Sequence, residues 1–254
     1  MEKIDTVILA GGFGTRISEK TKIIPKPMIS IGNDPILLHI IKKYHRAGID
    51  SFVIATGYKF NIVNDFFKKK SLNYEKIEKN SFSFNYKIEK KIIKIKTIFT
   101  GHKTLTGTRI LKIKRYIKTK KFFLTYGDGL SNVNLKELLN FHNRNKRIAT
   151  ITAVRPPVRF GELVIKNDLV TSFKEKPQLN DGWINGGFFV FEDNFFKIIN
   201  QKQNVMLERQ PLESLTKKKK LIAYKHKGFW QCMDTLRDYN ILKKLNKKNA
   251  PWKK

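Results

Sequence analysis

A glycine-rich run directly after an apolar segment constrains the fold of this chain more than any other feature. Residues 4–10 are apolar and of the β type, and the run Leu9-Ala10-Gly11-Gly12-Phe13-Gly14-Thr15-Arg16 overlaps their end. This pattern predicts a first strand with a tight loop at its carboxyl end, where open α/β sheets bind their ligands. Three glycines in four positions let the backbone pass close to phosphates and direct N–H groups at them.

Two cations accompany the loop. Arg16 closes it, and Lys26 follows ten residues later within Pro25-Lys26-Pro27. Arginine offers a rigid fork of donors and lysine a mobile point charge, so the pair suits the phosphates of a nucleoside triphosphate. The pattern lacks both the GxxxxGK[ST] of a P-loop and the GxGxxG of a dinucleotide fold. A strand-to-helix turn without a ligand is the alternative.

Segments typical of strands and helices alternate along the chain. Strands are predicted at 51–56, 122–126 and 149–154, and helices at 61–69, at 135–145 and between Asp34 and Gly48. Such alternation predicts an α/β fold, with one Rossmann-like domain over residues 1–254 and a mixed, mostly parallel sheet flanked by helices. Apolar residues alternate with lysines between 81 and 97, which predicts a β-hairpin projecting from the main sheet.

The charge of the chain raises the possibility of a nucleic-acid partner. The formal net charge is +31, yet only ten of the 52 basic residues are arginine, and the lysines are spread through nearly every segment. No nucleic-acid-binding motif accompanies them, so we expect no nucleic-acid partner. No apolar run reaches the ~18 residues of a membrane span and no signal segment is evident, so we expect a cytoplasmic protein without a membrane partner.

Further motifs follow in a fixed order: Thr125-Tyr126-Gly127-Asp128-Gly129, Pro156-Pro157-Val158-Arg159-Phe160-Gly161, Phe173-Lys174-Glu175-Lys176-Pro177, Ile184-Asn185-Gly186-Gly187 and Gly228-Phe229-Trp230-Gln231-Cys232-Met233-Asp234-Thr235-Leu236-Arg237-Asp238. With the GGxGTR…PKP pattern of the first loop, they resemble the sugar-phosphate nucleotidyltransferases. Ser18-Glu19-Lys20-Thr21 and the last motif resemble the branch of that family that transfers a cytidylyl group. The resemblance implies the nucleotide-diphospho-sugar transferase fold.

The resemblance also assigns a nucleotide site. It implies that the first loop wraps the triphosphate and that Lys26 contacts the phosphates. The nucleotide-binding residues are then Leu9, Ala10, Gly11, Gly12, Phe13, Gly14, Thr15, Arg16, Lys26, Thr104, Arg109 and Gly127. Arg16, Lys26 and Asp128 are expected to be catalytic. For Arg109, a solvent-facing position in the first turn of a helix is the alternative.

Two aspartates are candidate metal ligands. Asp128 follows a predicted strand, which places it at the same sheet edge as the glycine loop, although a turn residue is the alternative. Asp234 directly precedes a predicted helix, so it could instead be the N-cap. The resemblance implies that both hold Mg²⁺, which favours few carboxylates together with waters and substrate phosphates.

A second anion site is expected around Glu175-Lys176-Pro177. Lys176 could bind a phosphate while Glu175 accepts hydrogen bonds from sugar hydroxyls; an exposed charge pair before a turn is the alternative. The resemblance implies a sugar-phosphate site lined by Glu175, Lys176, Asn185 and Gly187.

The expected reaction joins CTP and α-D-glucose 1-phosphate, giving CDP-glucose and pyrophosphate. The resemblance implies a homo-oligomer, hexameric in that branch, whose product serves O-antigen and lipopolysaccharide biosynthesis. UTP or dTTP could replace CTP in the same chemistry, because phosphate-binding motifs do not select a base. A regulatory nucleotide-binding module without catalysis is a further alternative, but both metal-site aspartates are present.

Overall fold

The computed structural model describes residues 3–155, 162–174 and 182–253. The strands of the main sheet are β1 (Asp5–Ala10), β4 (Ser51–Thr56), β5 (Asn73–Glu78), β6 (Ser81–Ile88), β7 (Lys91–Phe99), β8 (Lys121–Tyr126), β10 (Ala149–Val154), β13 (Ile184–Glu192) and β14 (Leu221–His226). Three short pairs complete the strands: β2 (Ser30–Ile31) with β3 (Asp34–Pro35), β9 (Gly129–Ser131) with β15 (Trp230–Cys232), and β11 (Glu162–Lys166) with β12 (Leu169–Lys174). The helices are α1 (Ser18–Thr21), α2 (Ile36–Arg46), α3 (Phe60–Lys70), α4 (Thr106–Lys112), α5 (Leu135–Asn145), α6 (Gln210–Lys217) and α7 (Leu236–Lys248).

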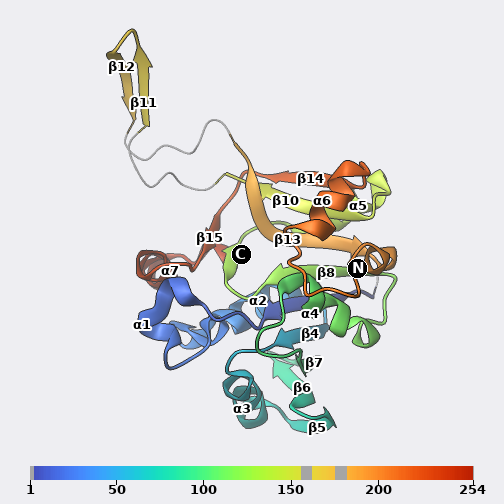
Figure 1. The fold of residues 1–254 in the computed structure, drawn as a ribbon. Helices are drawn as coiled ribbons and strands as arrows, with labels where there is room; N and C mark the ends of the chain where they lie inside the picture. Colours follow the sequence, from blue (N-terminus) through green and yellow to red (C-terminus); the bar gives the residue numbers. More distant parts are fainter. Residues whose placement is uncertain (1–2, 156–161, 175–181, 254) are drawn as a thin grey trace.

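The main sheet has nine strands in the order β14-β10-β13-β8-β1-β4-β7-β6-β5, and helices flank it (Figure 1). Its centre, β8-β1-β4-β7, is parallel, whereas β13 runs antiparallel between β8 and β10. Leu9 pairs with Tyr126 and Ala10 pairs with Thr56. The carboxyl ends of β8, β1 and β4 therefore meet at one edge, which confirms the predicted mixed α/β sheet.

Each face of the sheet has its own apolar core. Successive strand residues point to opposite faces, so Ile8 belongs to the core packed against α2, α3 and α7, while Val7 belongs to the core packed against α4 and α6. On β8, Phe123 joins the first core and Phe122 the second. Helices on both faces thus hold the central strands, and the residues just beyond their carboxyl ends, in fixed positions.

The predicted β-hairpin forms, but it does not project from the sheet. β6 and β7 pair antiparallel, and β7 also pairs in parallel with β4, from Ser51–Lys94 to Thr56–Phe99. The isoleucines between the lysines explain this position, because Ile93 and Ile95 are buried in the first core. The hairpin that lies away from the main sheet is β11–β12 (Figure 1). Among the described residues, no helix is long and apolar enough to cross a membrane.

Lys43 on α2 provides a pH-dependent test of the packing. The side chain is 8% exposed, and no described carboxylate pairs with it. Burial, together with the nearby charge of Arg46, lowers its pKa to about 8. Between pH 8 and the ordinary lysine pKa of 10.5, the unfolded chain retains a proton that the folded chain has released, so this residue makes stability rise with pH in that window.

We therefore expect Lys43→Met to stabilise the protein at pH 7 by up to about 3 kcal/mol, because it removes an unpaired buried charge. The gain should shrink above pH 10.5, where the lysine is neutral in both states. Urea unfolding at pH 7 and pH 11 measures the difference. Lys42→Met on the same helix is the control, since Lys42 is paired with Asp34 at 2.5 Å and its loss should bring no gain. A Lys43→Met protein that is less stable at pH 7 contradicts the prediction.

Candidate active site

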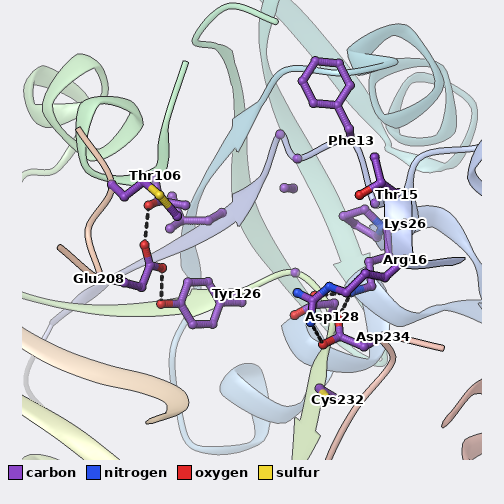
Figure 2. A pocket seen from close by; sticks show the side chains of 18 of the residues that line it. Phe13, Thr15, Arg16, Lys26, Thr106, Tyr126, Asp128, Glu208, Cys232 and Asp234 are labelled. Carbon is purple, nitrogen blue, oxygen red and sulfur yellow. Dashed lines mark hydrogen bonds and ion pairs between the residues drawn. The ribbon is translucent and has the colours of Figure 1, made fainter. Parts of the chain in front are cut away.

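A cavity of about 1050 Å³ lies at the carboxyl edge of the central strands (Figure 2). This volume is at the upper end of small-molecule sites and has room for two substrates. Its wall includes the residues predicted for the nucleotide and the metal: Leu9, Ala10, Gly11, Gly12, Phe13, Gly14, Thr15, Arg16, Lys26, Thr104, Arg109, Gly127, Asp128 and Asp234. The structure thus brings together residues that are far apart in the sequence.

The glycine loop is held in shape by its own backbone and by α1. Gly14 has a φ of +67°, a conformation that favours glycine. Its carbonyl accepts hydrogen bonds from the Thr21 hydroxyl at 3.0 Å and from the Ile17 amide at 3.1 Å. A Cβ at Gly14 would also lie 2.8 Å from the Thr21 side chain. Any other residue at position 14 would strain the backbone and clash with Thr21, so the conformation of the loop requires glycine here.

Arg109 lies behind the loop rather than in solvent. Its guanidinium is buried and donates to the carbonyls of Gly11 at 2.8 Å, Thr56 at 3.0 Å and Gly101 at 2.9 Å, and to the Thr100 hydroxyl at 2.5 Å. Burial lowers its pKa to about 10. A Cβ at Gly11 would lie 2.4 Å from this guanidinium. Arg109 therefore joins the ends of β1, β4 and β7, and most of its donors are already used by the protein.

Lys26 joins the two predicted metal ligands. Its ammonium is 2.6 Å from Asp128 Oδ2 and 2.5 Å from Asp234 Oδ1, and Arg16 donates to Asp234 Oδ2 at 2.5 Å. Figure 2 shows these four side chains gathered on one side of the cavity. Burial by itself lowers the pKa of Lys26, but Asp128 and Asp234 outweigh it and the pKa lies above its ordinary value. Lys26 is therefore a permanent cation between two carboxylates.

This arrangement fits a divalent cation. The two carboxylates already converge on one positive group, so their oxygens are close enough together to share an ion. No group of three or more metal-ligating side chains occurs within the described ranges, which leaves waters and substrate phosphates to complete a coordination shell. Asp234 is not the N-cap of α7, because Thr235 takes that place and accepts from the Asp238 amide. The Asp234 side chain is thereby free to face the cavity.

A second polar cluster lies across the cavity from these charges (Figure 2). Glu208 accepts hydrogen bonds from the Tyr126 hydroxyl at 2.5 Å and from the Thr106 hydroxyl at 2.7 Å, and Asn185 donates to the Tyr126 oxygen at 3.2 Å. Burial and the Glu208 charge raise the pKa of Tyr126 well above its ordinary value, so it remains a donor. No sequence motif identifies Glu208 as a site residue.

The residues predicted for the sugar-phosphate site have different outcomes. Asn185 is on the cavity wall, but Gly187 is not, and its amide instead donates to Asn185 Oδ1 at 2.8 Å. Glu175 and Lys176 fall outside the described residues.

The segment 18–21, which carries part of the resemblance, forms α1 and is not on the cavity wall; Thr21 contacts the glycine loop by donating to the Gly14 carbonyl. Cys232 does line it, and burial, reinforced by the nearby aspartates, raises the pKa of its thiol to about 12.

Solved structures confirm the fold. HddC from Yersinia pseudotuberculosis matches with a TM-score of 0.69 and 24% identity over 95% of this chain and 98% of its own. UDP-glucose pyrophosphorylase, solved with UDP-glucose, matches with a TM-score of 0.68 and 20% identity over 97% and 99% of the two chains. At these identities the likeness concerns the fold alone.

Sequence relatives carry more information. The glucose-1-phosphate cytidylyltransferase of Salmonella typhimurium is 40% identical over 252 residues, covering 97% of this chain and 98% of the relative. A probable glucose-1-phosphate cytidylyltransferase of Bacillus subtilis is 38% identical over 250 residues, with the same coverage. The family described as Nucleotidyl transferase matches residues 5–244. The resemblance drawn from the motifs is confirmed, and the chain belongs to the nucleotidyl transferase family.

Proposed function

We propose that this protein transfers the cytidylyl group of CTP to α-D-glucose 1-phosphate, giving CDP-glucose and pyrophosphate. The observation that carries the proposal is the cavity in which Arg16, Lys26, Asp128 and Asp234 converge beside the glycine loop. The relatives at 40% and 38% identity, which match over nearly their whole length, support the choice of both substrates.

The glycine loop and its cations would bind the triphosphate. Arg16 and Lys26 supply positive charge, and the N–H groups of the loop add fixed donors. One phosphate oxygen of the sugar phosphate attacks the α-phosphorus of CTP, and the bond from that phosphorus to the departing pyrophosphate breaks. The nucleophile is already ionised at neutral pH, so no covalent intermediate with the enzyme is required. The protein's contribution is positioning and neutralisation of charge.

Asp128 and Asp234 would hold Mg²⁺ in this proposal. When bound, the ion supplies positive charge that neutralises the phosphates during transfer. Lys26 and Arg16 pair with the same carboxylates, which keeps two adjacent negative charges from facing each other unpaired. Their ammonium and guanidinium groups thus lie at the position where a polyphosphate needs cations.

The sugar would lie toward Glu208. Its carboxylate is fixed by Tyr126 and Thr106 and faces the same cavity, where it can accept hydrogen bonds from sugar hydroxyls. Asn185, held near Tyr126, is a second polar contact. Glu175 and Lys176 remain predicted contributors to this sugar-phosphate site, whereas Gly187 would act through Asn185, to which its amide donates. A cytoplasmic location, a hexamer and a role in O-antigen synthesis likewise remain predictions.

A coupled assay of pyrophosphate release tests the proposal. Purified protein with glucose 1-phosphate and Mg²⁺ should use CTP at least ~100-fold better than UTP or dTTP, because a site fitted to one base leaves its polar groups unpaired with another. Reactions without glucose 1-phosphate, or with EDTA, are the controls and should release none. Equal rates with all three nucleotides would retain the chemistry and remove the cytidylyl preference. No release with any of them would overturn the proposal.

A further inference from the structure

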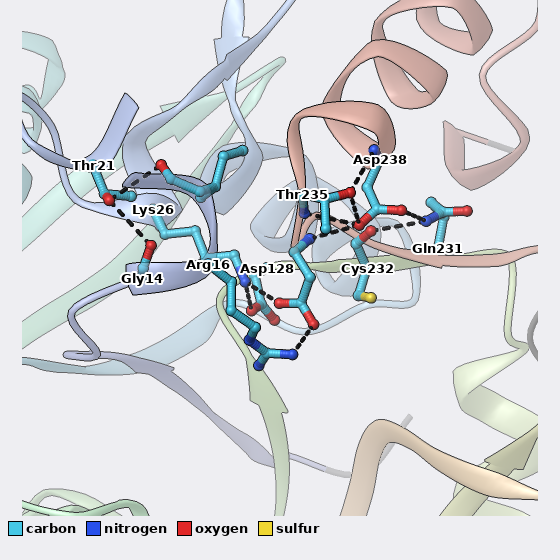
Figure 3. Close-up of polar contacts among 11 residues, drawn as sticks. Gly14, Arg16, Thr21, Lys26, Asp128, Gln231, Cys232, Thr235 and Asp238 are labelled. Carbon is cyan, nitrogen blue, oxygen red and sulfur yellow. Dashed lines mark hydrogen bonds and ion pairs between the residues drawn. The ribbon is translucent and has the colours of Figure 1, made fainter. Parts of the chain in front are cut away.

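Asp238, in the first turn of α7, has a buried carboxylate at the edge of the site. It is 6% exposed and, among the described residues, forms no ion pair. Its Oδ2 accepts from the amide of Asp234 at 3.1 Å, the amide of Thr235 at 2.9 Å and the Thr235 hydroxyl at 2.8 Å. Its Oδ1 accepts from the side-chain amide of Gln231 at 3.0 Å (Figure 3).

A helix cap accounts for only part of this set of contacts. In a capping box, the N-cap residue and the residue three positions later satisfy each other's amides, here Thr235 and Asp238. The bonds to Asp234 and Gln231 are additional. Gln231 lies on β15, which pairs with β9 directly after Asp128. One carboxylate therefore connects the helix, the strand next to Asp128, and the backbone of Asp234.

The side chain and the backbone of Asp234 are held by different residues. Lys26 and Arg16 contact its carboxylate, whereas Asp238 accepts its backbone N–H. In the proposed function both cations bind the polyphosphate, so they are not dedicated partners of Asp234. Asp238 is buried, and its bond to the Asp234 amide holds the backbone from which the Asp234 carboxylate extends.

We propose that Asp238 is a positioning residue for the metal site: it orients Asp234 so that its carboxylate shares a divalent cation with Asp128. This inference rests on the proposed function of the two aspartates. A positioning role differs from a capping role because the loss of Asp238 should weaken metal binding as well as the helix.

The test measures Mn²⁺ affinity by the electron paramagnetic resonance signal of the free ion, with α,β-methylene CTP present so that no turnover occurs. We expect Asp238→Ala to raise the Mn²⁺ dissociation constant about tenfold or more, as losses of outer hydrogen-bond partners do. Asp238→Asn should stay within about threefold of the unmodified protein, because its amide oxygen can still accept from the Asp234 and Thr235 amides.

Asn134→Ala is the matched control. Asn134 caps α5, away from the cavity, by accepting from the amides of Lys136 and Glu137. Its loss should lower the melting temperature, as a lost cap does, and leave Mn²⁺ affinity unchanged. The inference is overturned if Asp238→Ala binds Mn²⁺ as Asn134→Ala does, or if Asp238→Asn is as weak as Asp238→Ala. Failure of the unmodified protein to bind Mn²⁺ with the analogue would instead overturn the proposed function.

Discussion

Asp128→Asn and Asp234→Asn should each lower kcat by about 100- to 1000-fold, and the double variant should be little worse than either single one. The reason is that both carboxylates converge on one position, so losing either disables the same unit. Pyrophosphate release at saturating CTP, glucose 1-phosphate and Mg²⁺ measures the effect. Circular dichroism should show an unchanged fold, since asparagine keeps the size of the side chain.

Asp34→Asn is the control for this pair. Asp34 forms an ion pair of the same kind, with Lys42 at 2.5 Å, but it is not on the wall of the large cavity. Its replacement should leave kcat within about twofold of the unmodified protein, the range expected for a surface ion pair. Turnover near the unmodified rate in Asp234→Asn would show that this carboxylate serves only to pair Lys26 and Arg16.

Arg109→Met should destabilise the protein by about 3 kcal/mol or more, because it removes several charge-assisted hydrogen bonds that the buried guanidinium makes. The same change should raise KM for CTP, since the Gly11 carbonyl is held by this guanidinium. The stability and the KM for CTP of Arg109→Lys should lie between those of Arg109→Met and the unmodified protein, because an ammonium has no planar fork to reach all of these carbonyls at once. Urea unfolding and the CTP dependence of the rate measure the two effects.

Arg115→Met is the matched control, because Arg115 is an exposed arginine that pairs with Glu78 and should contribute little to stability. Nucleotide binding, which the resemblance implies for Arg109, and the joining of strand ends, which its hydrogen bonds indicate, give different results. A residue that binds phosphate alone would lose CTP affinity without loss of stability, whereas a residue that joins the strand ends loses both. A stable Arg109→Met protein would therefore contradict the role that the hydrogen bonds indicate.

The position of Asp128 could be predicted from the sequence. The apolar residues of 4–10 and 122–126 mark two strands, and the carboxyl ends of parallel neighbours meet at one sheet edge. The structure pairs Leu9 with Tyr126, and the Gly127 amide donates to the Leu9 carbonyl at 2.9 Å. Local apolar patterns and one topological rule were enough for this part of the site.

Arg109 and Glu208 show what the local sequence does not contain. The partners of Arg109 include Thr56 and Gly11, which are 53 and 98 residues away, and those of Glu208 include Thr106, 102 residues away. Such contacts depend on how loops fold over one another, which spacing within a segment does not describe. The prediction that the hairpin at 81–97 projects from the sheet is wrong for a related reason, since alternation predicts strands but not which neighbouring strand they join.

The strands β9 and β15 pair directly with each other beside Asp128 and Asp234. The distance between these two carboxylates therefore does not depend on the length of the chain that connects them. Gly129 pairs with Cys232, and the Met233 amide donates to the Asp128 carbonyl at 2.9 Å. A residue inserted into a surface loop between these strands lengthens the connection without moving either aspartate. A residue inserted within either strand turns the following side chains to the opposite face. We therefore expect insertions to be tolerated in the surface loops that connect β9 with β15, and not within these two three-residue strands.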